Sequence, residues 1–172
     1  RHLSMKAIEL TSPGVVRVVD RPEPVAGDGE VLLRVRRVGY CGTDLSSYRG
    51  INPLVSYPRV PGHEIGAMIE RLGPGVGEPW RVGQNVIVIP YRNCGNCSAC
   101  RSGRPNCCSH NETLGVQREG AMTELIAVSA MTLIASLTLI VEPCRSPSFD
   151  GAWPAAKREM TIFSSSVMRP FE

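Results

Sequence analysis

The strongest constraint on the fold is a cluster of cysteines near the middle of the chain. The stretch NCGNCSACRSGRPNCC, residues 93–108, holds five of the seven cysteines in the sequence. Three of them are spaced C-x2-C-x2-C, and the short spacers of small and polar residues allow turns that aim sulfur atoms inward. Grouped thiolates of this kind are typical of a closed, four-coordinate zinc site. The sequence therefore predicts structural zinc held by Cys94, Cys97, Cys100 and a fourth thiol.

Two neighbouring cysteines compete for the fourth position. Gly103 and Pro105 help the chain fold back, so that either Cys107 or Cys108 could arrive at the metal. The alternative interpretations are an iron–sulfur cluster and loose reactive thiols. An iron–sulfur centre usually comes with other cofactor machinery, and a disulfide framework would need matching cysteines elsewhere in the chain. We find neither, so zinc is the prediction.

A second group of metal-ligand residues occurs earlier in the chain. The segment CGTD contains Cys41, Thr43 and Asp44, and the segment PGHE contains His63 and Glu64. A lone cysteine is most often a small core residue, and a lone histidine is more often a satisfied polar group than a ligand. Together, a thiol, an imidazole and a carboxylate form a mixed donor set suited to catalytic zinc with an open coordination position.

Short strands dominate the expected secondary structure between residues 5 and 133. β-Branched runs bounded by proline and glycine clusters are typical of strands at regular spacing, as in a barrel or sandwich. Residues 41–50 have an Asn/Asp-type helix start and predict one short helical turn. The expected strand regions are residues 15–20, 30–40, 64–77 with a closing glycine turn, 81–91, and 121–135 with two strands.

The sequence motifs around the two groups of possible metal ligands occur in an order that resembles a known protein family. CGTD, PGHE, a VG..V pair and the C-x2-C-x2-C-x7-C segment resemble, over residues 5–143, the zinc-dependent medium-chain alcohol and polyol dehydrogenases. SYPRVPGHE is more similar to the sorbitol, threonine and sugar-acid branches than to the ethanol branch. The resemblance implies one GroES-like catalytic domain, mainly β with short helices, built as a partly open β-barrel. A structural zinc lobe at about residues 92–110 would protrude from it.

The resemblance also implies a role for each residue of the second group. Cys41 and His63 would be ligands of catalytic zinc, and Thr43 would relay the substrate proton. Glu64 would be a ligand or a close neighbour of the metal. Because adjacent residues of a strand face opposite ways, His63 and Glu64 bind together only where the backbone is irregular. Asp44 would either hold a histidine near the metal or cap a turn.

The remaining ligands follow from the same resemblance. Cys108 rather than Cys107 would complete the structural site. The last protein ligand of the catalytic zinc would be Glu142, in the segment IVEP, with Cys144 as a rival. The structural site would then consist of Cys94, Cys97, Cys100 and Cys108.

The activity implied is oxidation of a secondary alcohol, polyol or sugar acid, with hydride transfer to NAD(P). Zinc would lower the pKa of the substrate hydroxyl, and the nicotinamide would supply the redox chemistry. The family binds its dinucleotide in a Rossmann domain with a G-x-G-x-x-G turn. We find no such turn, since GPGVG at residues 73–77 precedes another strand and reads as a barrel turn. We therefore expect the Rossmann domain and its NAD(P) site to be missing and the isolated chain to be inactive.

The two ends of the chain differ in character from its middle. Residues 1–4 resemble a vector remnant before Met5. Residues 144–172 form an atypical tail, for which a frame-shifted continuation and a disordered segment are the two interpretations. Without a Rossmann half, an apolar packing surface would be exposed, which predicts self-association. The alternative to an enzyme is a non-catalytic zinc-binding structural or interaction module.

Composition excludes two other classes of partner. A net charge of +3 spread along the chain and 5% aromatic residues argue against a nucleic-acid-binding surface. The longest apolar run, residues 125–141, is interrupted by Ser and Thr and is shorter than the roughly 18 residues that a membrane span needs. The prediction is a cytoplasmic protein whose partner is a small-molecule alcohol or polyol.

Overall fold

The computed structural model describes residues 4–135 of the 172 in the chain, and these residues are mainly β. The strands are β1 (Ser4–Ser12), β2 (Val15–Pro22), β3 (Glu30–Gly39), β4 (Glu64–Leu72), β5 (Asn85–Val88), β6 (Tyr91–Arg92), β7 (Glu112–Thr113), β8 (Leu125–Ser129) and β9 (Leu133–Ala135). The helices are α1 (Gly42–Tyr48) and α2 (Ser98–Arg101), with 3-10 turns η1 (Pro105–Cys107) and η2 (Ala130–Thr132).

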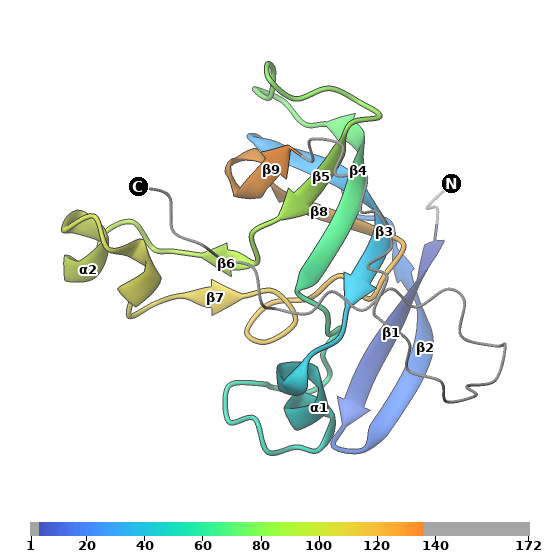
Figure 1. The fold of residues 1–172 in the computed structure, drawn as a ribbon. Coiled ribbons are helices and arrows are strands. Elements are labelled where there is room, and N and C mark those ends of the chain that lie inside the picture. Colours follow the sequence, from blue (N-terminus) through green and yellow to red (C-terminus); the bar gives the residue numbers. More distant parts are fainter. Residues whose placement is uncertain (1–3, 136–172) are drawn as a thin grey trace, which may run out of the picture. The chain divides into compact units, whose positions relative to one another are not determined.

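The strands form three separate antiparallel sheets. The largest has the order β8-β3-β4-β5-β9, and its two outer strands do not pair with each other (Figure 1). β1 and β2 form a hairpin, and β6 pairs with β7. In Figure 1, the β6–β7 pair and α2 extend away from the five-stranded sheet as an arm. This arm carries residues 94–108, the cysteine-rich stretch.

Strand β3 lies at the centre of the packing because it buries both of its faces. Val31 and Leu33 are fully buried in the main core, on one side of the sheet. Leu32, on the other side, packs with Met5 of the hairpin and with Leu125. The run VLL therefore does not alternate in burial as a half-exposed strand would. β3 also pairs with two partners, β4 and β8.

The pairing of β3 with β4 fixes the place where the two ligand segments meet. Gly39, the last residue of β3, lies opposite Glu64, the first residue of β4. The chain leaves β3 toward Cys41 and enters β4 from His63, so both residues emerge at the same end of the sheet. The register shifts between Leu32 and Leu33, and again after Val35; such bulges increase the local twist of a strand pair.

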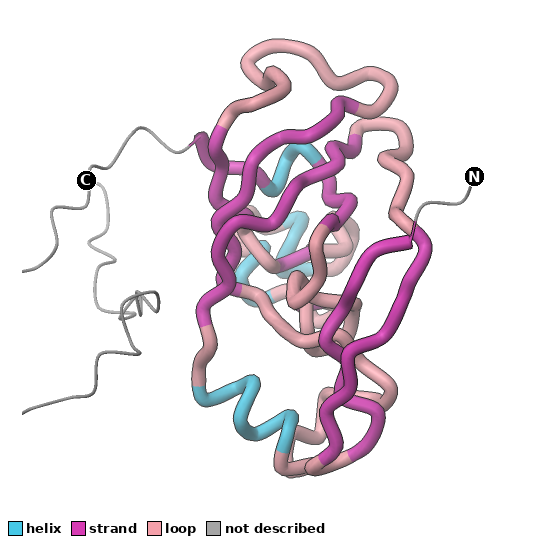
Figure 2. Tube along the Cα trace, turned by 90° about the vertical axis from the view of Figure 1, so that its right-hand side faces the viewer, coloured by secondary structure: helices cyan, strands magenta, loops and turns pink. Residues whose placement is uncertain are grey.

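Helix α1 starts at this end of the sheet, and Figure 2 shows it near the turn of the β1–β2 hairpin. The Gly14 N–H of that turn donates to the Tyr48 carbonyl at 2.7 Å. The N-cap of α1 is Cys41, whose Sγ accepts the Thr43 N–H. Asp44 completes a capping box by accepting the Cys41 N–H. The expected helix is confirmed, but its cap is a sulfur atom rather than an Asn or Asp oxygen.

All five expected strand regions contain strands, and residues 121–135 supply two, as predicted. Ser4, at the edge of the suspected vector remnant, is part of β1 and pairs with Pro22. None of the helices in residues 4–135 has the length and hydropathy of a membrane span.

We predict that Ile69→Ala will destabilise the fold by about 2–5 kcal/mol, since removal of a buried branched side chain leaves a cavity. Ile69 lies on β4, is 0% exposed and belongs to the main core. Ile87→Ala, on the neighbouring strand, is the matched control. Ile87 is 46% exposed, so its truncation should cost less than about 1 kcal/mol. Urea unfolding followed by circular dichroism measures both. An equal loss of unfolding free energy in the two variants would contradict the assignment of Ile69 to the core and of Ile87 to the surface.

Candidate metal centres

Two groups of potential metal ligands form within the part of the chain that the structure describes. In each group, one ligand atom from every residue lies within 4.8 Å of the others. The first group is the thiol cluster of the arm, and the second joins the end of β3 to the start of β4. Their members are Cys94, Cys97, Cys100 and Cys108, and Cys41, Asp44 and His63.

The thiol cluster has the dimensions of a zinc–sulfur cage. The Sγ atom of Cys108 lies 3.5 Å from that of Cys94 and 3.9 Å from that of Cys97. Four sulfur ligands about 2.3 Å from one zinc ion, at tetrahedral angles, lie about 3.8 Å apart. The donor set and its spacing therefore fit zinc.

Backbone amides surround the sulfur atoms. The Cys94 N–H and the His110 N–H donate to the Cys108 sulfur at 3.3 and 3.4 Å. The Cys97 N–H donates to the Cys94 sulfur at 3.3 Å. Such donors stabilise thiolates, because they place partial positive charge beside the sulfur. The backbone in this segment thus orients N–H groups toward the sulfur atoms and favours the thiolate forms that bind a cation.

The thiols differ in how readily they ionise. The backbone N–H groups of Cys100 and Ser109 lower the pKa of Cys97 to about 5. Desolvation, reinforced by the neighbouring sulfurs, raises the pKa of Cys100 to about 12. The protein alone therefore supports some but not all of the negative charge that four thiolates would carry. A divalent cation would supply the missing compensation.

Cys108, not Cys107, meets the other three thiols. Cys107 is exposed at the end of η1, whereas Cys108 is half-buried and bonded to the amides described above. The two residues are adjacent, so only one side chain can point into the turn. The structure thus distinguishes between two positions that spacing alone left open.

At the second centre, a thiol and an imidazole face each other. The Cys41 Sγ lies 3.2 Å from the His63 Nε2. Zinc bonds of about 2.3 Å to sulfur and about 2.0 Å to nitrogen, at tetrahedral angles, would place these atoms about 3.5 Å apart. The observed separation fits a shared metal ion after a small adjustment. Among the described residues, Cys41 and His63 are the sulfur and nitrogen donors of this centre, beside the Asp44 carboxylate.

Asp44 supports both of these residues. It is 2% exposed, and its Oδ2 accepts the Cys41 N–H at 3.0 Å. Its Oδ1 lies 3.6 Å from the His63 Nδ1, a buried atom without a hydrogen-bond partner in the described residues. A carboxylate behind one ring nitrogen leaves the other nitrogen free for a metal. Of the two roles considered for Asp44, capping the turn is confirmed by its bond to the Cys41 N–H, while holding the histidine stays a prediction supported by its position beside the ring.

The electrostatics of the second centre follow from this contact. The Asp44 carboxylate raises the pKa of His63 to about 9, although burial opposes the shift. Burial on its own would raise the pKa of Asp44. The contact with His63 and the backbone groups of Cys41 and Gly62 outweigh it, and the pKa of Asp44 is lowered. Asp44 is thus a buried anion facing the imidazole.

Gly62 sets the direction in which His63 enters the site. Its φ is +99°, a conformation that residues with a Cβ rarely adopt. A Cβ at this position would also lie 3.0 Å from the Val38 side chain and 3.1 Å from Met122. The glycine of the PGHE motif is therefore required by the backbone just before the histidine.

Glu64 and Thr43 differ in their relation to this centre. Glu64 lies outside the three-residue group, and its carboxylate lies over Gly39, where any Cβ would clash with it. Thr43 is exposed on the first turn of α1, two residues after Cys41. Glu142 and its rival Cys144 lie outside the described residues.

Sequence reasoning missed residues 119–122, a segment that bonds to the backbone of residues 60–62 directly before His63. The amides of Gly120, Ala121 and Met122 donate to the three carbonyls of residues 60–62, at 2.7 to 2.9 Å. These contacts join segments almost 60 residues apart, outside any named strand. Neither periodicity nor a motif signals such pairing. The only local sign of a close approach between backbones is the presence of Gly115 and Gly120.

Comparisons with known proteins identify the family of this chain. Residues 27–137 match the alcohol dehydrogenase GroES-like domain. The chain is 46% identical over 122 residues to an uncharacterized zinc-type alcohol dehydrogenase-like protein of Haemophilus influenzae, covering 71% of this chain and 36% of that protein. It is 42% identical over 114 residues to L-galactonate-5-dehydrogenase of Escherichia coli, covering 66% and 33%.

A solved structure supports the fold. An alcohol dehydrogenase of Escherichia coli CFT073, RspB, crystallised with NADH, has a TM-score of 0.71 and 39% identity over 77% of this chain and 38% of that one. The chain thus spans about a third of the length of these relatives. The expected GroES-like fold, mainly β and with open sheets, is confirmed. The chain belongs to the medium-chain, zinc-type alcohol dehydrogenase family, whose GroES-like domain it contains.

Proposed function

We propose that this chain supplies the catalytic zinc centre of a dehydrogenase that oxidises a secondary alcohol, polyol or sugar acid. The observation that carries the proposal is the contact between Cys41 and His63, with Asp44 buried behind the imidazole. A centre of two protein donors with open positions suits catalysis, whereas four thiols and no open position suit structure. The thiol cluster of the arm is therefore proposed as the structural site.

The proposed roles follow from the positions of the residues. Cys41 and His63 hold the catalytic metal, and Asp44 keeps the His63 Nδ1 turned away from it. Bound zinc would lower the pKa of the substrate hydroxyl. The exposed Thr43, two residues beyond Cys41, passes the hydroxyl proton toward solvent. Glu64 and Glu142 are proposed as the acidic residues that complete or adjust the centre.

The proposed reaction removes two hydrogens from the substrate. Thr43 would pass the hydroxyl proton outward, and bound NAD(P)⁺ would supply the acceptor for the hydride from the carbon, so that the secondary alcohol becomes a ketone. The complex of the RspB relative with NADH supports the choice of a nicotinamide as acceptor. L-galactonate-5-dehydrogenase and sorbitol dehydrogenase relatives support a polyol or sugar acid as substrate. The catalytic domain is proposed to extend over residues 5–143, with the zinc lobe at about 92–110.

We predict two zinc ions per wild-type chain, falling to one in His63→Ala, because the imidazole is one of two soft donors at its centre. His110→Ala is the matched control. The His110 side chain is exposed and only its backbone N–H contacts a cluster sulfur, so this variant should keep two zinc ions. Elemental analysis after gel filtration gives the count. One zinc in the wild type, unchanged by His63→Ala, would contradict the second centre.

We predict that Cys108→Ser will lose the structural zinc while the adjacent substitution Cys107→Ser will keep it. Loss of one of four thiolates removes a metal ligand, and the arm buries no apolar side chain between Val88 and Leu114 that could compensate. Zinc analysis and limited proteolysis of the arm measure the effect. Equal zinc content in both variants would refute the assignment of Cys108.

The experiment that tests the function uses cobalt as a spectroscopic probe of the catalytic centre. We predict that Co²⁺-loaded protein titrated with L-galactonate or sorbitol will show a shift in its visible absorption, since an open metal position accepts a hydroxyl oxygen. His63→Ala should show no shift with either compound. A wild-type spectrum that both compounds leave unchanged would overturn the proposed substrate class.

A further inference from the structure

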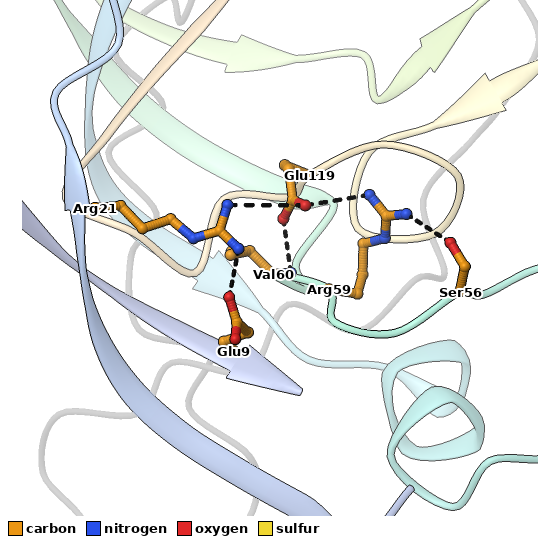
Figure 3. Close-up of polar contacts among 6 residues, drawn as sticks. All are labelled: Glu9, Arg21, Ser56, Arg59, Val60 and Glu119. Carbon is orange, nitrogen blue, oxygen red and sulfur yellow. Dashed lines mark hydrogen bonds and ion pairs between the residues drawn. The ribbon is translucent and has the colours of Figure 1, made fainter. Parts of the chain in front are cut away.

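We infer that Glu119 is a positioning residue for His63, acting through the backbone that leads into the histidine. The inference rests on the proposed function, in which His63 holds the catalytic metal. Glu119 itself does not touch the centre. Its carboxylate accepts the Val60 N–H at 2.8 Å, three residues before His63 (Figure 3).

The segment before His63 depends on side chains to satisfy its amides. Pro61 has no N–H, so residues 60–62 offer only two backbone donors. The amide of Val60 bonds to the Glu119 carboxylate. Val60 is 2% exposed, and a buried amide that loses its partner is costly. The Glu119 carboxylate thus fixes the backbone directly before Pro61.

The same segment has its carbonyls bonded to the residues that directly follow Glu119. The Gly120 N–H donates to the Val60 carbonyl at 2.7 Å, and the Ala121 N–H to the Gly62 carbonyl at 2.9 Å. A Cβ on Gly120 would clash with the Pro61 carbonyl, so the two backbones are in close contact. Glu119 therefore anchors the start of a backbone pairing that ends next to His63.

Glu119 also pairs with two cations, and one of them, Arg59, has no other carboxylate partner among the described residues. Its Oε1 lies 3.4 Å from the Arg59 Nη1 and 3.8 Å from the Arg21 Nη1 (Figure 3). The Arg59 side chain is only 12% exposed, and its Nε is buried without a partner in the described residues. Arg21 is also paired with Glu9 of the hairpin. Glu119 thus links the hairpin to the segment that carries the ligand.

Two substitutions of Glu119 separate the effect of its hydrogen bond to the Val60 N–H from the effect of its negative charge. Glu119→Ala removes both, whereas Glu119→Gln keeps an oxygen that can accept the Val60 N–H and loses only the charge. Glu124→Ala is the matched control. Glu124 is also an exposed glutamate whose carboxylate accepts a distant backbone N–H, that of Lys6 at 2.9 Å, but it does not contact residues 59–63.

The test measures zinc affinity at each of the two centres by competition with a chromophoric chelator, together with the thermal midpoint of each variant. We expect Glu119→Ala to weaken the His63-dependent zinc by about tenfold, the lower end of the effect of outer residues on metal sites. Glu119→Gln should restore most of that affinity. Glu124→Ala should leave it unchanged, and the thiol cluster should bind equally in every variant.

The outcomes distinguish the inference from the function on which it rests. Unchanged affinity of the His63-dependent zinc in Glu119→Ala overturns the inference alone. Equal weakening in Glu119→Ala and Glu124→Ala, or weakening at both zinc centres in parallel with the thermal midpoint, also overturns it, because the effect would then be general destabilisation. A wild-type chain without a His63-dependent zinc overturns the proposed function and the inference together.

Discussion

The pairing of β3 with β4 is the constraint on which the fold and the site both depend. β3 is buried on both faces, so its position in the sheet cannot shift without exposing Val31 or Leu32. Its register with β4 places Gly39 opposite Glu64. Cys41 lies two residues after Gly39, and His63 directly precedes Glu64, so the two side chains meet at this end of the sheet. A slip of one residue would move every side chain of a strand to the opposite face, and it would separate the thiol from the imidazole.

The arm with the thiol cluster differs from the sheet in having no hydrophobic core of its own. Within residues 89–113, all of which the structure describes, no apolar side chain is buried. A segment without a core needs another source of stability, and a bound metal is the usual one in small domains. The hydrogen bonds from backbone amides to sulfur orient the thiols, but they cannot offset four negative charges. The sheet is stabilised by buried apolar side chains, whereas the arm has none and would need a bound metal to compensate.

Local signals in the sequence were sufficient to predict most strands and the residues that gather as possible metal ligands. They were insufficient to predict the residues that hold those ligands in position. The β-branched runs predicted β2 to β5, and ligand-type residues at short spacing predicted that the cluster thiols would gather. The sulfur cap of α1 was not foreseen, because cysteine is not among the preferred capping residues. Glu119 was not foreseen either, since its contacts with Val60 and Arg21 cross large distances in sequence. Such supports depend on how the chain returns to itself, which no local pattern encodes.

The two centres should differ in how firmly they hold a metal, and the difference has a structural cause. The thiol cluster gathers four sulfur donors from one short segment, so closing it orders little additional chain. The other centre takes its donors from two segments, one ending β3 and one entering β4. Its geometry is only as fixed as the backbone before His63, where Pro61 has no N–H and the Val60 amide is bonded to Glu119. Under the proposed function, the position of His63 at the metal therefore depends on Glu119, whose carboxylate bonds to the backbone before His63 and lies outside the group of possible ligands.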